Sequence, residues 1–355
     1  MKSIFERLVP PPAKITVGIN GFGRIGRAFM RLAAQTKDID VVAINDLGDV
    51  KNLAYLLKYD TPYRSPEFKV EAGDKSIMVG RKKVQVLSEK DPANIPWKKL
   101  GVDVVIESTG VFESYEKASG HLKGGASRVV ITAPLKNEPG NTGPTGETVL
   151  VGVNEDALGA SPITSNASCT TNAGSPLIAI LDETLGVDKA LLSTVHAYTA
   201  TQSLVDSPVK GSDLRRGRAA AQNIVPSSTG AAIAVTEAYP KLKGSFDGIS
   251  LRVPVVTGSI VDITFLSKKD TTAEEVNLIL ESAAQNPRWQ GIFTTTREQL
   301  VSSDIIGNPH ASIADLAFTR VVGGNLVKVL AWYDNEMGYT NTLIRHVRQA
   351  AHHIH

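Results

Sequence analysis

Three things are scarce in this sequence: cysteine, an excess of charge of either sign, and long apolar runs. Cys169 is the only cysteine among 355 residues, which excludes an internal disulfide and a zinc cluster built on cysteines. The 38 Lys and Arg residues nearly balance the 36 Asp and Glu residues, so the formal net charge is only +2. That balance gives no support for nucleic acid or an anionic membrane as the main partner. No apolar run reaches the roughly 18 residues that a membrane-spanning helix needs.

The composition is that of a globular protein, with 42% hydrophobic and 21% charged residues. At roughly 100–200 residues per domain, the length favours about two domains. Residues 1–13 lack the apolar core of a secretory signal and end in a run of three prolines, so we interpret them as a disordered extension. With a single cysteine and no signal, we expect a cytoplasmic protein. The HHIH end is interpreted as a tail, and no metal site is expected.

The first part of the chain alternates apolar runs with helical patterns. A helix is expected over 24–34, and strands are expected over 14–20, 40–45, 102–106, 128–131 and 149–153. Continuous runs of Val and Ile separated by helices favour a parallel sheet that is covered on both faces. Residues 60–66 and 138–147 carry Pro, Gly and Asn signals that predict loops.

The pattern changes after residue 150. Small and polar residues at 165–172 precede a helix, whose apolar stripe is formed by Leu177, Ile178, Leu181 and Leu185. Strands are expected over 191–198, within 249–267 and over 326–332, and 203–218 reads as a long loop. Thr272 and Glu275 form a capping-box signature for a helix that continues to about residue 285, and a last helix follows Met337.

A glycine-rich loop follows the first expected strand. Gly21, Gly23 and Gly26 match G-x-G-x-x-G at the start of a helix, and Asp46 ends the next strand 20 residues after Gly26. Such glycines allow a tight turn whose backbone N–H groups approach a pyrophosphate at a helix N-terminus. An acidic residue at Asp46 would accept hydrogen bonds from the ribose hydroxyls and repel a 2′-phosphate. The loop therefore predicts a dinucleotide site that favours NAD over NADP.

Cys169 lies among polar residues at the start of a helix. A lone cysteine is more often a buried small residue, but the positive end of a helix dipole lowers the pKa of a thiol and activates it. His196, at the end of an expected strand, is the candidate partner, because the other six histidines include three in the C-terminal tail. Spacing alone leaves open whether the two side chains meet.

At these residues the sequence resembles the phosphorylating glyceraldehyde-3-phosphate dehydrogenases. The resemblance covers nearly all of residues 14–348. It is carried by INGFGRIGR (19–27), ND (45–46), ESTG (107–110), SNASCTTN (165–172), HAYTATQ (196–202), LRRGRAAAQNIVPSSTGAA (214–232), RVP (252–254) and WYDNEMGY (332–339).

The resemblance implies a Rossmann-type doubly wound parallel sheet and an α+β catalytic domain with a mostly antiparallel sheet. After the extension at 1–13, the NAD-binding domain would span 14–168 and be completed by a C-terminal helix at about 336–352. The catalytic domain would span 169–335. A homotetramer is also implied.

The resemblance further implies the site. Cys169 would be the nucleophile and His196 its activating base. The dinucleotide would be held by Gly21, Gly23, Arg24, Ile25, Gly26, Asp46, Lys90, Thr109, Gly110, Thr132, Asn335 and Tyr339. Thr199 and Arg252 would bind the substrate phosphate. Ser168, Thr170, Thr229 and Gly230 would bind the incoming phosphate, and Arg216 would support both anions.

The implied reaction is the NAD-dependent oxidation of D-glyceraldehyde 3-phosphate with inorganic phosphate to 1,3-bisphosphoglycerate, in glycolysis or gluconeogenesis. It would proceed through a thiohemiacetal and a thioester on the cysteine. General-base assistance of this kind typically contributes about 10²–10⁴-fold. A serine nucleophile would give a more stable ester and lose the reactivity of the thioester.

Some alternatives stay open. A Cys–His acyl hydrolase would leave the glycine loop idle, and a non-catalytic NAD-binding protein would have no need for Cys169. Within the family, erythrose-4-phosphate dehydrogenase and an NADP-using member are alternatives. The sequence departs from the usual family pattern at Ala173, where many relatives have a second cysteine, and at Met337, where tryptophan is usual. The 207–213 loop carries about one extra residue.

Overall fold

The structure is a computed structural model that describes residues 14–136, 144–209 and 212–354. The chain divides into two compact units. The first comprises Met1–Glu147, Ala157–Ser165 and Leu343–His355, and the second comprises Thr148–Asp156 and Asn166–Thr342. The expected N-terminal extension, most of the 138–147 loop, two residues of the 207–213 loop and the last residue of the HHIH tail lie outside the described residues.

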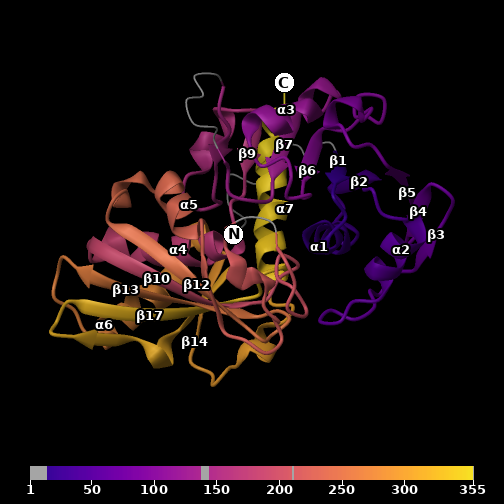
Figure 1. Cartoon of the computed structure of the whole chain (residues 1–355). Coiled ribbons are helices and arrows are strands. Elements are labelled where there is room, and N and C mark those ends of the chain that lie inside the picture. Colours follow the sequence, from indigo (N-terminus) through magenta and orange to yellow (C-terminus); the bar gives the residue numbers. More distant parts are fainter. Residues whose placement is uncertain (1–13, 137–143, 210–211, 355) are drawn as a thin grey trace. The chain divides into compact units, whose positions relative to one another are not determined.

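The first unit contains a nine-stranded sheet in the order β3-β4-β5-β2-β1-β6-β7-β9-β8 (Figure 1). Its strands are β1 (Ile15–Asn20), β2 (Ile39–Asn45), β3 (Val70–Ala72), β4 (Ser76–Val79), β5 (Lys82–Leu87), β6 (Val104–Glu107), β7 (Arg128–Ile131), β8 (Glu147–Thr148) and β9 (Ile163–Ser165). Its first helices are α1 (Arg24–Ala33), α2 (Val50–Lys58) and α3 (Tyr115–Lys123). The central strands pair in parallel, and only the β3-β4-β5 edge is antiparallel.

The centre of this sheet is a topological switch point. From β1 the chain proceeds to β2 on one side, whereas β6 lies on the other side of β1 and is followed outward by β7. The carboxyl ends of β1 and β6 are therefore adjacent, with Asn20 paired to Glu107. Open parallel sheets bind ligands in the crevice outside the strand ends at such a point.

The prediction of a strand over 149–153 is wrong. The strand β8 stops at Thr148, and the next residues form a turn with Gly152 at φ +84°. The Asn154 side chain closes this turn, accepting from Leu150 N and donating to Thr148 O, both at 2.8 Å. Val149 and Leu150 are buried without ladder partners, so their apolar character reflects burial and not strand pairing.

The second unit contains an eight-stranded sheet in the order β11-β12-β10-β13-β17-β15-β14, with β16 beside β17. The strands are β10 (Val187–Ala197), β11 (Val225–Ser228), β12 (Phe246–Val253), β13 (Ser259–Ser267), β14 (Phe293–Thr296), β15 (Ser312–Asp315), β16 (Arg320–Val322) and β17 (Leu326–Tyr333). Only the β10–β12 and β14–β15 pairs are parallel. The predicted combination of a doubly wound parallel sheet with a mostly antiparallel second sheet is confirmed.

The remaining helices are α4 (Cys169–Thr184), α5 (Ala231–Ala238), α6 (Ala273–Ala284) and α7 (Met337–Ala351). In α6, Thr272 Oγ1 accepts from Glu275 N at 3.1 Å, which confirms the expected cap. The Glu275 carboxylate, however, accepts from the Thr271 hydroxyl at 2.9 Å. Within the described residues, no helix combines the length and hydrophobicity needed to cross a membrane.

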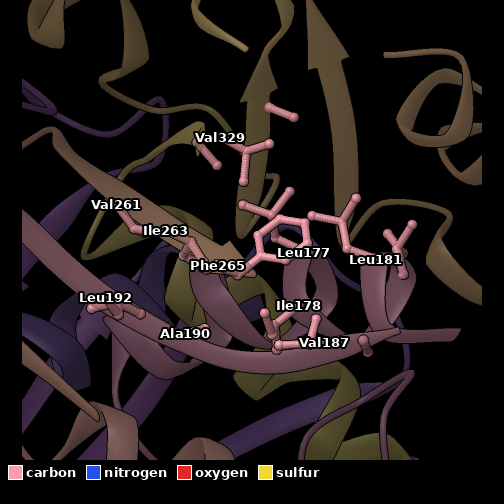
Figure 2. Packing of buried hydrophobic residues seen from close by; sticks show 14 of the residues in the cluster. Leu177, Ile178, Leu181, Val187, Ala190, Leu192, Val261, Ile263, Phe265 and Val329 are labelled. Atoms are coloured by element: carbon pink, nitrogen blue, oxygen red, sulfur yellow. The ribbon is translucent and has the colours of Figure 1, made fainter. Parts of the chain in front are cut away.

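The core of the second unit forms where α4 lies on the sheet. Leu177, Ile178 and Leu181 of α4 pack against inward residues of three strands, and Figure 2 shows them beside Leu192, Val261, Ile263, Phe265 and Val329. The predicted stripe is buried, but so are the polar Thr170, Thr171, Asn172 and Ser175 of the first two turns. The helix is therefore enclosed on nearly all sides, and its N-terminal turn is held in a fixed place.

Candidate active site

The glycine-rich turn joins β1 to α1 in the first unit. At Gly21 φ is +91°, and a Cβ there would lie 2.7 Å from Ser108 C. At Gly26 a Cβ would lie 2.3 Å from Gly21 O, so the helix meets the turn without room for a side chain. A Cβ at Gly23, in contrast, would have no protein atom within 4 Å. Packing therefore demands the first and third glycines, while the second leaves open space, which suits a pyrophosphate approaching the backbone.

Asp46 follows β2 and faces this turn. Its Oδ2 accepts from Phe22 N at 2.7 Å, and its Oδ1 accepts from Gly48 N at 2.8 Å. Two backbone donors thus fix the carboxylate beside the glycine loop. Asp46 therefore lies where the predicted contact with a ribose could form, and that role stays a prediction.

A cavity of about 390 Å³ lies at the switch point. Its lining includes the predicted cofactor residues Gly21, Gly23, Asp46, Lys90 and Thr109. Gly110 follows Thr109 at φ +70°, and Thr132 donates its hydroxyl to Glu107 O at 3.1 Å. Arg24 forms an ion pair with Asp60 at 2.5 Å, and neither Arg24 nor Ile25 lines this cavity.

Cys169 is the first residue of α4 in the second unit. Ser168 caps the helix, accepting from Thr171 N at 3.1 Å. Just before it, Ala167 has a φ of 51°, a left-handed conformation that a residue with a side chain rarely adopts. Asn172 Nδ2 donates to Asn166 O at 2.8 Å and thereby holds this turn. The thiol is thus presented at the positive end of a helix by a constrained backbone.

The strand register places four polar side chains on the sheet face that the thiol contacts. His196 near the end of β10 is paired with Arg252 of β12, and Ser259 of β13 is paired with Tyr333 of β17. Paired residues share a face of the sheet, so these side chains form a row beneath the first turn of α4. Cys169 Sγ lies 3.3 Å from His196 Nε2. The sequence left this contact open, and the structure shows it.

The other ring nitrogen of His196 has two neighbours. Nδ1 lies 2.6 Å from Ala197 O and 2.8 Å from Arg252 Nη1. A guanidinium only donates, so Nδ1 accepts from Arg252 in one tautomer and donates to Ala197 O in the other. The second tautomer leaves the Nε2 lone pair directed at the thiol, which is the form that accepts its proton.

Burial and charge set the protonation of this pair. Burial, and after it the positive charge of Arg252, lower the pKa of His196 to about 3, so the ring is uncharged at neutral pH. Burial raises the pKa of the Cys169 thiol, while Arg252 and hydrogen bonds from Thr170 act in the opposite direction. An uncharged imidazole beside a thiol is the arrangement that general-base activation requires.

Tyr333 is a site residue that the sequence analysis missed. Its ring contacts His196 edge-on at 5.9 Å, and its hydroxyl lies 2.9 Å from Thr170 Oγ1 and 2.7 Å from Thr194 Oγ1. The side chain is 1% exposed. Its position inside the WYDNEMGY motif was the available signal. It supports the histidine ring from beneath the helix terminus.

Asn335 is held by donors from the β13 side. Its Oδ1 accepts from Gly258 N at 3.0 Å and from Ser259 Oγ at 3.1 Å. Because a backbone N–H only donates, the atom facing it must be the amide oxygen, and the NH₂ group is left to donate to a ligand. Tyr339 donates to Ala167 O at 3.2 Å and so belongs to the turn before the thiol.

Of the predicted anion residues, Thr199, Arg216, Thr229 and Gly230 lie between strands, whereas Ser168 and Thr170 belong to the start of α4 and Arg252 lies in β12. Arg216 Nη1 donates to Thr201 Oγ1 at 3.3 Å, and Thr201 lies 2.9 Å from the Thr199 hydroxyl. Arg216 and Arg252 act on each other electrostatically, since Arg216 contributes to lowering the pKa of Arg252. Thr229 and Gly230 precede α5, and Thr229 Oγ1 accepts from Ala231 N at 3.1 Å. Two mutually repelling guanidiniums beside hydroxyls favour a bound anion.

Comparisons with known proteins agree with this geometry. Residues 15–115 match the family model "Glyceraldehyde 3-phosphate dehydrogenase, NAD binding domain", and residues 168–335 match the C-terminal domain of the same family. The glyceraldehyde-3-phosphate dehydrogenase of Streptomyces coelicolor is 48% identical over 333 residues, covering 93% of this chain and 96% of that protein. The chain belongs to the glyceraldehyde-3-phosphate dehydrogenase family.

Other family members give the same result. The enzyme of Borreliella burgdorferi is 48% identical over 335 residues, covering 92% of this chain and 97% of that protein. Glyceraldehyde-3-phosphate dehydrogenase B of Aspergillus oryzae is 46% identical over 329 residues, covering 92% of this chain and 96% of that protein. Membership confirms the resemblance, and the matched NAD-binding domain supports the predicted cofactor.

Proposed function

We propose that this chain is an NAD-dependent, phosphorylating glyceraldehyde-3-phosphate dehydrogenase. It would oxidise D-glyceraldehyde 3-phosphate with inorganic phosphate to 1,3-bisphosphoglycerate. The observation that carries the proposal is the 3.3 Å contact between Cys169 Sγ and His196 Nε2 at the N-terminus of α4. The chain that makes this contact also carries a dinucleotide cavity at a Rossmann switch point.

Cys169 supplies the nucleophile. As its sulfur bonds to the aldehyde carbon, the thiol proton passes to His196 Nε2, and His196 then delivers this proton to the former carbonyl oxygen to give a thiohemiacetal. His196, again uncharged, then removes the hydroxyl proton as the C–H bond breaks and the thioester forms. NAD, when bound, supplies the hydride acceptor. A phosphate oxygen finally attacks the thioester carbon, the C–S bond breaks, and the departing sulfur takes the proton held by His196, which returns the thiol and the uncharged ring and releases the acyl phosphate.

Two groups of residues hold the two phosphates. Thr199 and Arg252 would bind the substrate phosphate, and Ser168, Thr170, Thr229 and Gly230 would bind the attacking phosphate. Arg216 would support both groups; it donates to Thr201 Oγ1 at 3.3 Å and to Ser227 Oγ at 2.9 Å. Planar guanidiniums and hydroxyls suit phosphate oxygens because each donor meets a separate oxygen.

The dinucleotide residues divide by their chemistry. Gly21, Gly23 and Gly26 would carry the pyrophosphate, and Asp46 would accept from the ribose hydroxyls. Six other residues would lie along the dinucleotide, namely Lys90 and Thr109 from the cavity lining and Arg24, Ile25, Gly110 and Thr132 from outside it. Asn335 would donate from its amide to the nicotinamide carboxamide, with Tyr339 packed near it. We assign residues 14–168 with the last helix to NAD and residues 169–335 to catalysis.

We also propose a cytoplasmic homotetramer. In the second unit, α4 and α6 cover one face of the sheet, yet its other face carries apolar residues where a solvated face would be polar. Leu191 is 65% exposed and Ile249 is 53% exposed on neighbouring strands. A second copy of this chain is the occupant that the family suggests, and light scattering of the purified protein measures the resulting mass.

The deciding experiment follows absorbance of NADH with purified protein, D-glyceraldehyde 3-phosphate and NAD, with and without phosphate. We expect NADH formation that depends on phosphate. Cys169→Ser should lose turnover by at least about 10³-fold while NAD binding stays within about twofold, because the thiol lies outside the dinucleotide cavity. Normal turnover by that variant, or phosphate-independent turnover by the native protein, would contradict the proposal.

A further inference from the structure

A buried polar group lies directly beneath the dinucleotide cavity and is used by none of the steps above. At the switch point, Asn20 and Glu107 face each other at the ends of β1 and β6, and each is 2% exposed. Asn20 Nδ2 donates to Glu107 Oε2 at 2.5 Å. A carboxylate so deeply buried is costly unless donors surround it.

Four donors reach the Glu107 carboxylate. Besides Asn20, His121 Nε2 lies 2.9 Å from Oε2, and Thr109 offers both its backbone N–H at 2.8 Å and its hydroxyl at 2.5 Å to Oε1. Both oxygens therefore accept two hydrogen bonds. A carboxylate can accept all four of these hydrogen bonds at once.

Trp97 determines which nitrogen of His121 carries the proton. Trp97 Nε1 lies 3.0 Å from His121 Nδ1, and an indole nitrogen only donates. Nδ1 must therefore accept, so the proton of an uncharged ring lies on Nε2 and is donated to Glu107. Trp97 and His121 are both 0% exposed, so water does not replace either bond. The hydrogen bonds from Trp97 to His121 and from His121 to Glu107 therefore run in one donor-to-acceptor direction.

This hydrogen-bond network reaches residues that line the cavity. Thr109, which Glu107 holds by two bonds, lines the cavity, and its hydroxyl also accepts from Val111 N at 3.1 Å. Asn20 lines it as well and accepts at Oδ1 from Asn45 Nδ2 at 2.7 Å. The His121 ring contacts Phe112, a further lining residue, edge-on at 6.3 Å.

The glycine turn rests on the same group. Ser108 Oγ donates to Gly21 O at 2.7 Å, and the close approach at Gly21 places the turn directly on residues 108–109. A shift of Glu107 or Thr109 would therefore move the backbone that receives the pyrophosphate. A misplacement of about 1 Å in such a site is costly, because the donors no longer meet the ligand.

We propose that Glu107, His121 and Trp97 are positioning residues for the dinucleotide. Their fixed hydrogen-bond direction holds Thr109 and Asn20, and through them the two strand ends that border the cavity. The inference rests on the placement of NAD given under the proposed function. None of the three residues needs to touch the cofactor.

The test uses a Glu107→Gln substitution, which places two hydrogen-bond donors opposite each other. An amide has one oxygen and one NH₂ group, so its NH₂ meets a group that only donates in either orientation: Thr109 N in place of Oε1, or Asn20 Nδ2 in place of Oε2. Adding Trp97→Phe removes the indole N–H and frees His121 to take the other tautomer, whose Nε2 then accepts from the new amide. We expect Glu107→Gln to weaken NAD binding about tenfold or more, and the double variant to recover at least about threefold of that loss.

A structural role alone predicts the opposite order, because losing the buried indole bond would further loosen the double variant. Binding of NAD by the double variant that is no tighter than by Glu107→Gln would overturn the proposal. His121→Leu gives a second route, since it removes the donor to Glu107, and an unchanged dissociation constant for NAD would count equally against it. Thermal unfolding and the alkylation rate of Cys169, which lies in the other unit, establish that each variant is folded.

His346 offers a matched control. It is also 0% exposed in the first unit, lies 2.7 Å from the Thr164 hydroxyl, and is absent from the cavity lining. His346→Leu should lower stability and leave NAD affinity within about twofold; an effect as large as that of His121→Leu would overturn the proposal. Asp46→Ala separates the two hypotheses. If it weakens NAD and Glu107→Gln does not, only the positioning role fails, and if neither does, the NAD placement fails.

Discussion

Replacing Asp46 tests how the chain distinguishes NAD from NADP. Phe22 N and Gly48 N hold both carboxylate oxygens, at 2.7 and 2.8 Å, so the charge cannot turn away from a ligand. A 2′-phosphate on a ribose bound there would lie within about 5 Å. At an effective dielectric constant of about 20, each unit of charge then costs about 3 kcal/mol, and the positive charge of Lys90 across the cavity reduces that cost.

Two effects follow for Asp46→Ala. Losing the hydrogen bonds that a charged group makes to the ribose should weaken NAD by about 1.5–3 kcal/mol, which is about tenfold or more. Losing the repulsion should strengthen NADP by about 2 kcal/mol, or about thirtyfold. The NAD-to-NADP ratio of kcat/KM should therefore fall by about a hundredfold or more. Initial rates with each cofactor, at saturating substrate and phosphate, measure it.

Two controls make the interpretation specific. Asp49, three residues away, caps α2 by accepting from Lys51 N at 3.0 Å and Asn52 N at 3.1 Å. Asp49→Ala should cost about 1 kcal/mol of stability and leave the cofactor ratio unchanged. Added salt should raise NADP use by the native protein more than by Asp46→Ala, because screening weakens only the repulsion. A ratio that stays constant in Asp46→Ala would refute the reasoning.

Two further predictions concern the second unit. Burial acts to raise the pKa of Asp182, but hydrogen bonds from Lys241, Val187 N and Tyr239 outweigh it and lower the pKa. The ionised Asp182 therefore stabilises the folded state above the unfolded pKa near 4, and this stabilisation is lost as pH falls through the lower folded pKa. Asp182→Asn should lower the free energy of unfolding by about 2–3 kcal/mol at pH 7. In urea titrations, the free energy of unfolding of this variant should also depend less on acid pH than that of the native protein. Ser259→Ala should remove one hydrogen-bond donor to Asn335 and raise the KM for NAD about threefold to tenfold. The alkylation rate of Cys169 should change little. An unchanged KM for NAD would count against the proposed role of Asn335.

The strands at the centre of the first sheet were predictable because their burial on both faces leaves Val and Ile runs in the sequence. The same signal failed at Val149 and Leu150, which are buried in a turn that Asn154 closes. Hydrophobicity reports burial, and it reports a strand only where ladder partners exist. Here the Asn154 side chain hydrogen-bonds the backbone at Leu150 N and Thr148 O, and the segment forms a turn in place of a strand.

Some contacts in the candidate site could also be predicted from the sequence, and others could not. The glycine loop and Asp46 are close in sequence, so their spacing is enough to predict their meeting. Cys169 and His196 meet because α4 lies on the face of the sheet where the ends of β10, β12 and β17 align, and that register has no local signal. The anion residues entered the prediction only through the family resemblance. Trp97, whose role depends on a donor direction in the folded core, left no trace in any motif.

The near-zero net charge is compatible with sites for charged ligands. The charges that bind ligands are separated by sign, with Asp46 at the ribose and, in the other unit, Arg216 and Arg252 at the anion groups. Each sign acts over a few ångströms, where a fixed donor or acceptor outweighs the average field of the protein. The balance of 38 Lys and Arg against 36 Asp and Glu over the whole chain therefore weakens neither site. A balanced composition therefore excludes a broad basic surface, yet it is fully compatible with a protein whose ligands are all anionic.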